Sequence, residues 1–220
     1  MRDWLRARSL TLVMMGCFSV FLAGQVWTGW YDHNDALAEH GAAAVTLRAY
    51  LTTGHMWEAL FENWESEFLQ MAAFVTFTAV LVQQGSPESR RLGALELVDA
   101  DPREFAQLPD VPWPVRRGGW VLFVYERSLG LVLFLLFAIS WMGHALGGWS
   151  EYVHDQRLHG EPGVTLFTYV SSSRFWFESF QNWQSEFLSV AAMVWLSVYL
   201  RQRGSPESKP VHASHAETGR

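Results

Sequence analysis

Asp, Glu, Lys and Arg are missing from two long stretches of the chain, residues 9–31 and 128–150, each 23 residues long. At a rise of 1.5 Å per residue, a helix of that length measures about 34 Å and crosses a hydrocarbon core of about 30 Å. A long surface helix of a soluble protein has a charged outer face, and neither stretch has one. The pattern therefore predicts two transmembrane helices.

Two further uncharged stretches are shorter, 17 residues over 68–84 and 14 residues over 187–200. Fourteen residues make only about 21 Å of helix, so each helix must continue past the acid that precedes it. Aromatic residues spaced i, i+4, i+7, i+11 support this extension along one helix face. They are Trp57, Phe61, Trp64 and Phe68, and then Trp176, Phe180, Trp183 and Phe187. We therefore expect four transmembrane helices.

The four predicted helices form two copies of one pattern. Residues 8–90 align without a gap with residues 127–209, and 33 of the 83 aligned positions are identical. Such self-similarity indicates a tandem duplication, and two crossings per copy make the repeat parallel and not inverted. The predicted parts are a first repeat at 1–90, a Pro-rich cytoplasmic linker at 91–119, a second repeat at 120–209 and a disordered tail at 210–220.

Basic residues set the expected orientation. Of the 16 Lys and Arg residues, all but Arg48, Arg157 and Arg174 lie within residues 1–8, 85–127 or 201–220. The positive-inside rule then places both termini in the cytoplasm and the loops at 32–60 and 151–179 outside. Short apolar segments within these loops, 45–51 and 164–170, are expected to be interfacial helices. The fold expected is thus an all-α, multi-pass protein of the bacterial inner membrane, in contact with the lipid bilayer.

Polar residues on the second helix of each repeat are the first candidate site. They occupy positions i, i+3, i+4 and i+7, one helix face, which in a membrane bundle points inward. The candidates are Asn63, Ser66, Glu67 and Gln70, and in the second repeat Asn182, Ser185, Glu186 and Ser189. Glu67 and Glu186 either bind a cation or relay a proton, or anchor the packing of the helices.

His40 and His159 are a second matched ionisable pair, each followed by Gly and a Val-Thr-Leu segment. A metal site or a pH-responsive contact is one interpretation. A helix cap or a loop-packing role is the other, and it is favoured, since the nearest matched acids, Asp32 and Glu151, lie eight residues away, about 12 Å along a helix.

Composition excludes several classes. A net charge of −6 gives no sign of nucleic-acid binding, and one cysteine excludes an internal disulfide. The chain has no nucleophile elbow, phosphate-binding loop or paired-cysteine motif, so no catalytic residue, metal or cofactor is predicted. No substrate is indicated.

Three motifs occur in both repeats: Arg-Ser-Leu before the first helix, Asn-Trp-x-Ser-Glu-Phe-Leu in the second, and Gly-Ser-Pro-Glu-Ser after it. Together they resemble an uncharacterised family of bacterial integral membrane proteins, a domain of unknown function. The resemblance covers nearly the whole chain and implies a membrane location and the two-repeat plan. It implies no activity.

Two functions are therefore expected from the sequence. The favoured one is a non-enzymatic accessory or interaction protein, whose repeats pack through the Asn/Ser/Glu faces and which forms homo-oligomers. The alternative is a small transporter or channel in which Glu67 and Glu186 line a cation or proton path.

Overall fold

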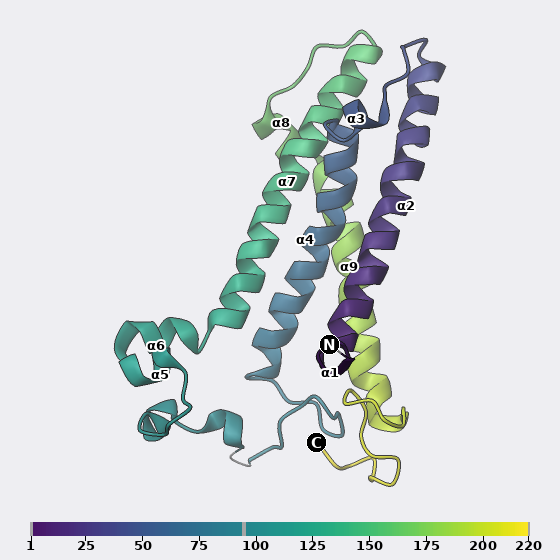
Figure 1. Cartoon of the computed structure of the whole chain (residues 1–220). Helices are drawn as coiled ribbons and strands as arrows, with labels where there is room; N and C mark the ends of the chain where they lie inside the picture. The colour runs from purple at the N-terminus through teal and green to yellow at the C-terminus, as the bar shows by residue number, and fades with distance from the viewer. Residues whose placement is uncertain (1, 94–95, 220) are drawn as a thin grey trace. The chain divides into compact units, whose positions relative to one another are not determined.

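The computed structural model describes residues 2–93 and 96–219, and these residues form helices and turns without a β-strand. The prediction of an all-α fold is confirmed. The helices are α1 (Arg2–Ala7), α2 (Ser9–Glu39), α3 (Leu47–Tyr50), α4 (Gly54–Thr78), α5 (Trp113–Arg117), α6 (Gly119–Tyr125), α7 (Ser128–Leu158), α8 (Leu166–Val170) and α9 (Ser173–Tyr199), with 3-10 turns at Leu97–Asp99 and Pro102–Phe105 (Figure 1).

Among the described residues, two helices are long and apolar enough to cross a membrane, α2 and α7, with 31 residues each. The sequence predicts four such helices. The other two, α4 and α9, are long enough at 25 and 27 residues. They are less apolar than α2 and α7, because Glu and Gln residues occupy their N-terminal halves.

Contacts divide the chain into two units. The first unit contains Met1–Phe61 and Met142–Trp176, and the second contains Glu62–Trp141 and Phe177–Arg220. Each unit therefore takes segments from both sequence repeats. Helices α4, α7 and α9 pass from one unit to the other without a break.

In the first unit, helices α3 and α8 repeat one local structure at positions 119 apart. Thr46 and Thr165 cap them, each through a side-chain oxygen that accepts a hydrogen bond from the backbone N–H three residues later. Short helices predicted at these positions are thus present. Each ends near a tyrosine that is 1% exposed, Tyr50 or Tyr169. A glycine on the preceding long helix makes room for each hydroxyl, because a Cβ there would collide with it.

Two tryptophans attach the loops to the long helices. The Trp30 indole N–H donates to the Val45 carbonyl and that of Trp149 to the Val164 carbonyl, both at 2.8 Å. In the first copy the amide of Asn34 adds two bonds: it donates to the Val45 carbonyl at 3.1 Å and accepts from the Val45 N–H at 2.7 Å. Three of these hydrogen bonds thus hold the loop after α2, and one holds the loop after α7.

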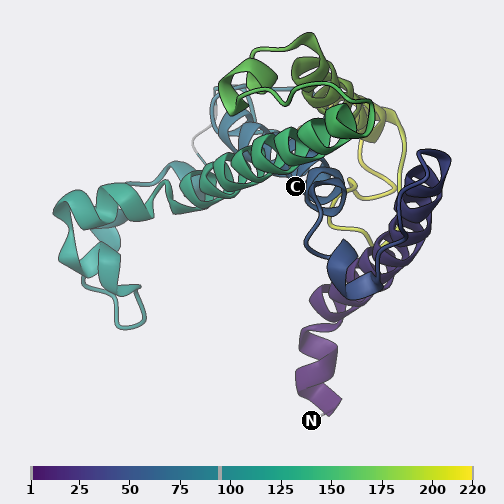
Figure 2. The ribbon, with the colours of Figure 1, turned by 90° about the horizontal axis from the view of Figure 1, so that it is seen from above.

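Seen from above, α1 runs at an angle to α2 (Figure 2).

In the second unit, both Gly-Ser-Pro-Glu-Ser motifs close into the same turn after α4 and α9. The final serine hydroxyls, of Ser89 and Ser208, accept hydrogen bonds from the N–H of Gln83 at 2.8 Å and of Gln202 at 2.9 Å. Gly85 and Gly204 take φ of 89° and 88°, a conformation that favours glycine. The motif is therefore a structural turn in both copies.

The described part of the predicted disordered tail, residues 210–219, makes several contacts with these turns. Lys209 is 2% exposed, and its ammonium group donates to the carbonyls of Ser214, His215 and Glu217 at 3.0–3.1 Å. The Gly85 N–H donates to Thr218 Oγ1 at 2.8 Å. Thr218 thus lies against the first turn.

Removing the indole donors is expected to destabilise the two loops unequally. Trp149→Phe leaves the Val164 carbonyl without its indole donor and should lower the free energy of unfolding by about 1 kcal/mol. Trp30→Phe should cost less, because the Asn34 amide still donates to the Val45 carbonyl. Thermal unfolding of the purified protein measures both, with the exposed Trp120→Phe as control. Equal losses at the two positions would contradict this account.

Candidate functional site: the ionisable face of α4

Four ionisable residues lie on one face of α4. His55, Glu58, Glu62 and Glu65 are spaced three, four and three residues apart, which keeps their side chains on one side of a helix. From the first to the last the helix rises about 15 Å. We call these four residues the ionisable face of α4. It is adjacent to the polar face of α4 that was predicted from sequence.

His55 begins this face and joins two other groups of the first unit. Its Nδ1 lies 3.2 Å from the Tyr50 hydroxyl, and its Nε2 lies 3.6 Å from a carboxylate oxygen of Asp32. Burial, and then the charges of Asp32 and Glu151, raise the pKa of the Tyr50 phenol, so the phenol keeps its proton near neutral pH. A carboxylate beside Nε2 favours the tautomer with its proton there. The Tyr50 hydroxyl therefore donates to Nδ1.

Glu151 of α7 connects this group to two more histidines. One of its oxygens accepts the His55 backbone N–H at 2.8 Å, at the N-terminus of α4, where the helix dipole favours negative charge. The other lies 3.9 Å from Nδ1 of His33. The rings of His33 and His154 have centroids 6.2 Å apart, and both residues line a pocket of about 310 Å³ with Glu151.

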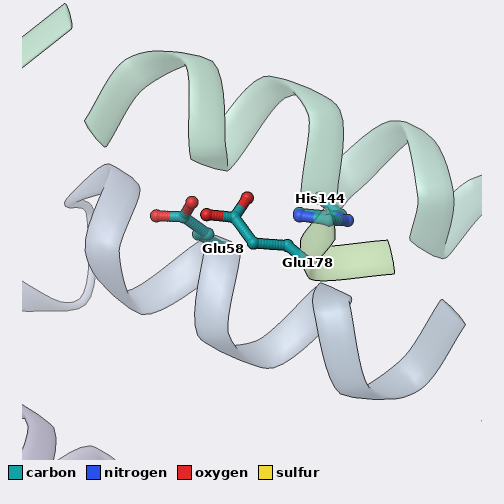
Figure 3. A group of neighbouring side chains, drawn as sticks. All are labelled: Glu58, His144 and Glu178. Atoms are coloured by element: carbon teal, nitrogen blue, oxygen red, sulfur yellow. The ribbon is translucent and has the colours of Figure 1, made fainter. Parts of the chain in front are cut away.

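Glu58 is the second member of the face, and it lies beside His144 of α7 (Figure 3). A carboxylate oxygen of Glu58 and a ring nitrogen of His144 are within 4.8 Å of one another. His144 is fully buried, and its ring stacks on Phe175 with centroids 4.8 Å apart. The Tyr169 hydroxyl donates to Glu58 at 3.4 Å. Figure 3 also labels Glu178, which lies one turn after Phe175 on α9 and belongs to the second unit.

Glycines on α7 allow the backbone of α4 to approach α7 closely near Glu58 and His144. A Cβ on Gly147 would lie 2.6 Å from the Glu58 backbone nitrogen, and one on Gly143 would collide with the Phe61 ring. These residues form a Gly-x-x-x-Gly pattern, which allows helix backbones to approach closely. This contact was not predicted from sequence, although the Gly-x-x-x-Gly pattern is visible at 143–147.

Glu62 and Glu65 complete the face, in the second unit, and both receive donors from α9. The Asn182 amide donates to Glu62 at 2.6 Å, and the Trp183 indole N–H donates to Glu65 at 3.1 Å. Glu65 has 0% of its surface exposed. The second repeat has Gln181 and Gln184 at the corresponding positions, so neither acid is matched between the repeats.

Comparison with known proteins identifies the family. A family model described as a domain of unknown function, DUF6766, matches residues 1–220. The chain belongs to the DUF6766 family. The expected membership of an uncharacterised family is thereby confirmed. Searches of curated proteins and of solved structures found no match.

The polar stripe predicted from sequence has a different arrangement in this DUF6766 chain. Of its members, Ser66 is buried; Gln70, Asn182 and Glu186 are half-buried; and Asn63, Glu67, Ser185 and Ser189 are exposed. The three serine hydroxyls each donate to the carbonyl three residues earlier on their own helix, at 2.8 Å. Within the second unit, Glu67 and Glu186 lie close enough for their charges to interact. Among the stripe's members, Asn182 donates to the ionisable face.

The other predicted pair, His40 and His159, lies in the first unit beyond the ends of α2 and α7 in this DUF6766 chain. Their Nε2 atoms are 3.4 Å apart. The structure thus brings together two histidines that are 119 residues apart in the chain, although neither contributes to the ionisable face.

Substitution of Glu65 separates the effect of its charge from that of its hydrogen bond. Glu65→Leu leaves the Trp183 indole N–H without this acceptor in a buried position and should cost about 1–3 kcal/mol of stability. Glu65→Gln retains a carbonyl oxygen and should cost less. Thermal unfolding of both variants, beside Glu67→Gln at an exposed position, provides the measurement. An equal loss for Gln and Leu would contradict the role assigned to the indole bond.

Proposed function

We propose that this protein is an integral membrane protein that moves protons or small cations along the ionisable face of α4. The observation that carries the proposal is Glu65, an acid with no exposed surface, in a row with Glu62, Glu58 and His55. Acids inside membrane bundles are costly and mark ion or proton pathways. Their spacing along α4 supports stepwise transfer from one group to the next.

In this proposal α4 and α9 cross the membrane together with α2 and α7. The exposed surfaces of α2 and α7 support a lipid environment: they carry large apolar side chains such as Leu10, Phe21, Leu129 and Phe134, each at least 58% exposed. Contiguous apolar surface of this kind is unfavourable in water. In the second unit, the carboxylates of Glu62 and Glu65 then meet donors of α9 instead of lipid.

The chemistry of the face suits a positively charged cargo. Glu62 and Glu65 accept N–H donors from α9 through Oε1, and carboxylate oxygens are also the atoms that bind a proton or a small cation. In the first unit, the Asp32–His55–Tyr50 group contains an imidazole, which can take up and release a proton near neutral pH.

A second candidate is the non-enzymatic accessory protein, and one observation favours it. Within the first unit, His33 and Leu37 are the buried residues of α2, whereas residues 9–24 of this helix are exposed almost throughout. A helix with so much uncovered surface can receive a helix of a second copy or of a membrane partner. An accessory protein of this kind would form homo-oligomers through this surface.

Flux measurements distinguish the two candidates. In liposomes containing the purified protein, we expect a pH gradient or a Na⁺ or K⁺ gradient to dissipate faster than in protein-free liposomes. Glu65→Gln and Glu62→Gln should return the rate to the protein-free value, since each removes a charge while keeping an oxygen for the donor from α9.

The double variant Glu67→Gln/Glu186→Gln serves as the matched control, because Glu67 is exposed and neither acid belongs to the ionisable face. Its flux should equal that of the unchanged protein. Loss of flux in this control alone would move the path to the stripe predicted from sequence. Absence of flux for every ion would reject transport and leave the accessory role.

The proposed orientation has both termini and the linker at 91–119 in the cytoplasm of a bacterial cell, with α3 and α8 outside. Alkaline phosphatase is active only outside the cytoplasm. A fusion within the linker should therefore be inactive, and one near residue 42 or 161 active. High activity of the linker fusion would reverse the orientation.

A further inference from the structure

His40 and His159 are held at the ends of α2 and α7 by identical local structures. Each histidine precedes a glycine with positive φ, 67° at Gly41 and 75° at Gly160. The residues that follow close the helix end: the Ala42 N–H donates to the Leu37 carbonyl at 2.9 Å, and the Glu161 N–H to the Gln156 carbonyl at 2.8 Å. This glycine-dependent helix ending fixes the backbone of each histidine.

The backbone also fixes the tautomer of each ring. His40 Nδ1 lies 2.9 Å from the Ala36 carbonyl oxygen, and His159 Nδ1 lies 2.9 Å from the Asp155 carbonyl oxygen. A carbonyl oxygen only accepts hydrogen bonds, so Nδ1 must carry a proton in both rings. In a neutral imidazole the other nitrogen, Nε2, then has a free lone pair. Both rings therefore present Nε2 as a ligand atom.

The two Nε2 atoms face each other at 3.4 Å. Two lone pairs at this distance repel unless a positive charge lies between them. Zinc binds imidazole nitrogen at about 2.0–2.1 Å in tetrahedral geometry, which places two such nitrogens about 3.3–3.4 Å apart. The observed separation therefore matches two histidine ligands on one tetrahedral ion.

Three surrounding features support a cation at this position. The Nδ1–H bonds to backbone carbonyls are the outer contacts that orient histidine ligands in metal sites. Two helix C-termini end here, and their carbonyl groups favour positive charge. Both rings are exposed, so an ion can enter from solution and complete its coordination with water.

We propose that His40 and His159 form a binding site for a divalent transition metal ion of the zinc class. This site is separate from the ionisable face of α4, and the proposal does not depend on ion transport. The sequence favoured a cap or loop-packing role for these histidines and left a metal site as the other interpretation. Both roles are compatible here, since the capping contacts use Nδ1 and leave Nε2 for the metal.

Zinc titration of the full chain tests the site. The protein carries no polyhistidine tag, and His212→Asn/His215→Asn removes the two tail histidines from both the reference and the variants. Binding is followed by competition with a chromophoric zinc indicator. We expect His40→Asn and His159→Asn each to remove the same single equivalent of bound Zn²⁺. Asn keeps an N–H donor for the carbonyl four residues earlier but lacks the nitrogen lone pair.

His154→Asn is the matched control, because His154 is an exposed histidine of the same unit that lies outside the pair. It should retain that equivalent. Unchanged zinc binding in both His40→Asn and His159→Asn, or a loss in only one of them, would overturn the proposal.

A second measurement needs no substitution at the pair. In the ¹⁵N-histidine spectrum, zinc should shift Nε2 of two rings while their Nδ1 atoms stay protonated. Zinc X-ray absorption should show two imidazoles at about 2.0–2.1 Å. The metal site would be rejected if the two rings share a proton, if zinc causes no shift of Nε2, and if X-ray absorption shows no imidazole ligand. This outcome holds even if the variants fail to fold.

Discussion

The close approach of α4 and α7 at Gly143 and Gly147 is the contact on which the rest of the first unit depends. With no side chain at Gly147, the Glu58 backbone reaches the α7 backbone, and His144 is then enclosed beside the Glu58 carboxylate. A larger residue would separate the helices and admit water or lipid to both groups. The buried ionisable groups therefore depend on the close packing of the two backbones, because each buried polar group needs a partner within hydrogen-bonding distance.

The helical architecture followed from simple features of the sequence. The uncharged stretches at 9–31 and 128–150 predicted the two long helices α2 and α7, and the apolar segments at 45–51 and 164–170 predicted α3 and α8. Helical periodicity determines where a helix runs and which residues share a face. The acids of α4 and α9 make these helices less apolar than α2 and α7.

The candidate site was harder to predict, and Glu65 explains why. Comparison of the two repeats emphasised Glu67, which is an acid in both, over Glu65, which is paired with Gln184. Residues that match between the two repeats show what the repeats have in common. A contact between α4 and α9, in contrast, joins non-equivalent positions of the two repeats. The Trp183 donor to Glu65 is of this kind. The His40–His159 pair was found from sequence because it joins equivalent positions, but its 3.4 Å separation depends on three-dimensional packing.

The unlike partners across α4 and α9 have a consequence for symmetry. Two identical copies of the first repeat, related by a two-fold axis, would carry every carboxylate twice, and four acids would replace Glu62, Glu65, Gln181 and Gln184. Repulsion among them would oppose assembly at the centre of such a dimer. A chain whose two copies differ at these positions escapes this restriction, since α4 supplies the negative charge while α9 supplies an amide and an indole. Divergence at matched positions therefore permits a set of partners that no homodimer of one repeat could form.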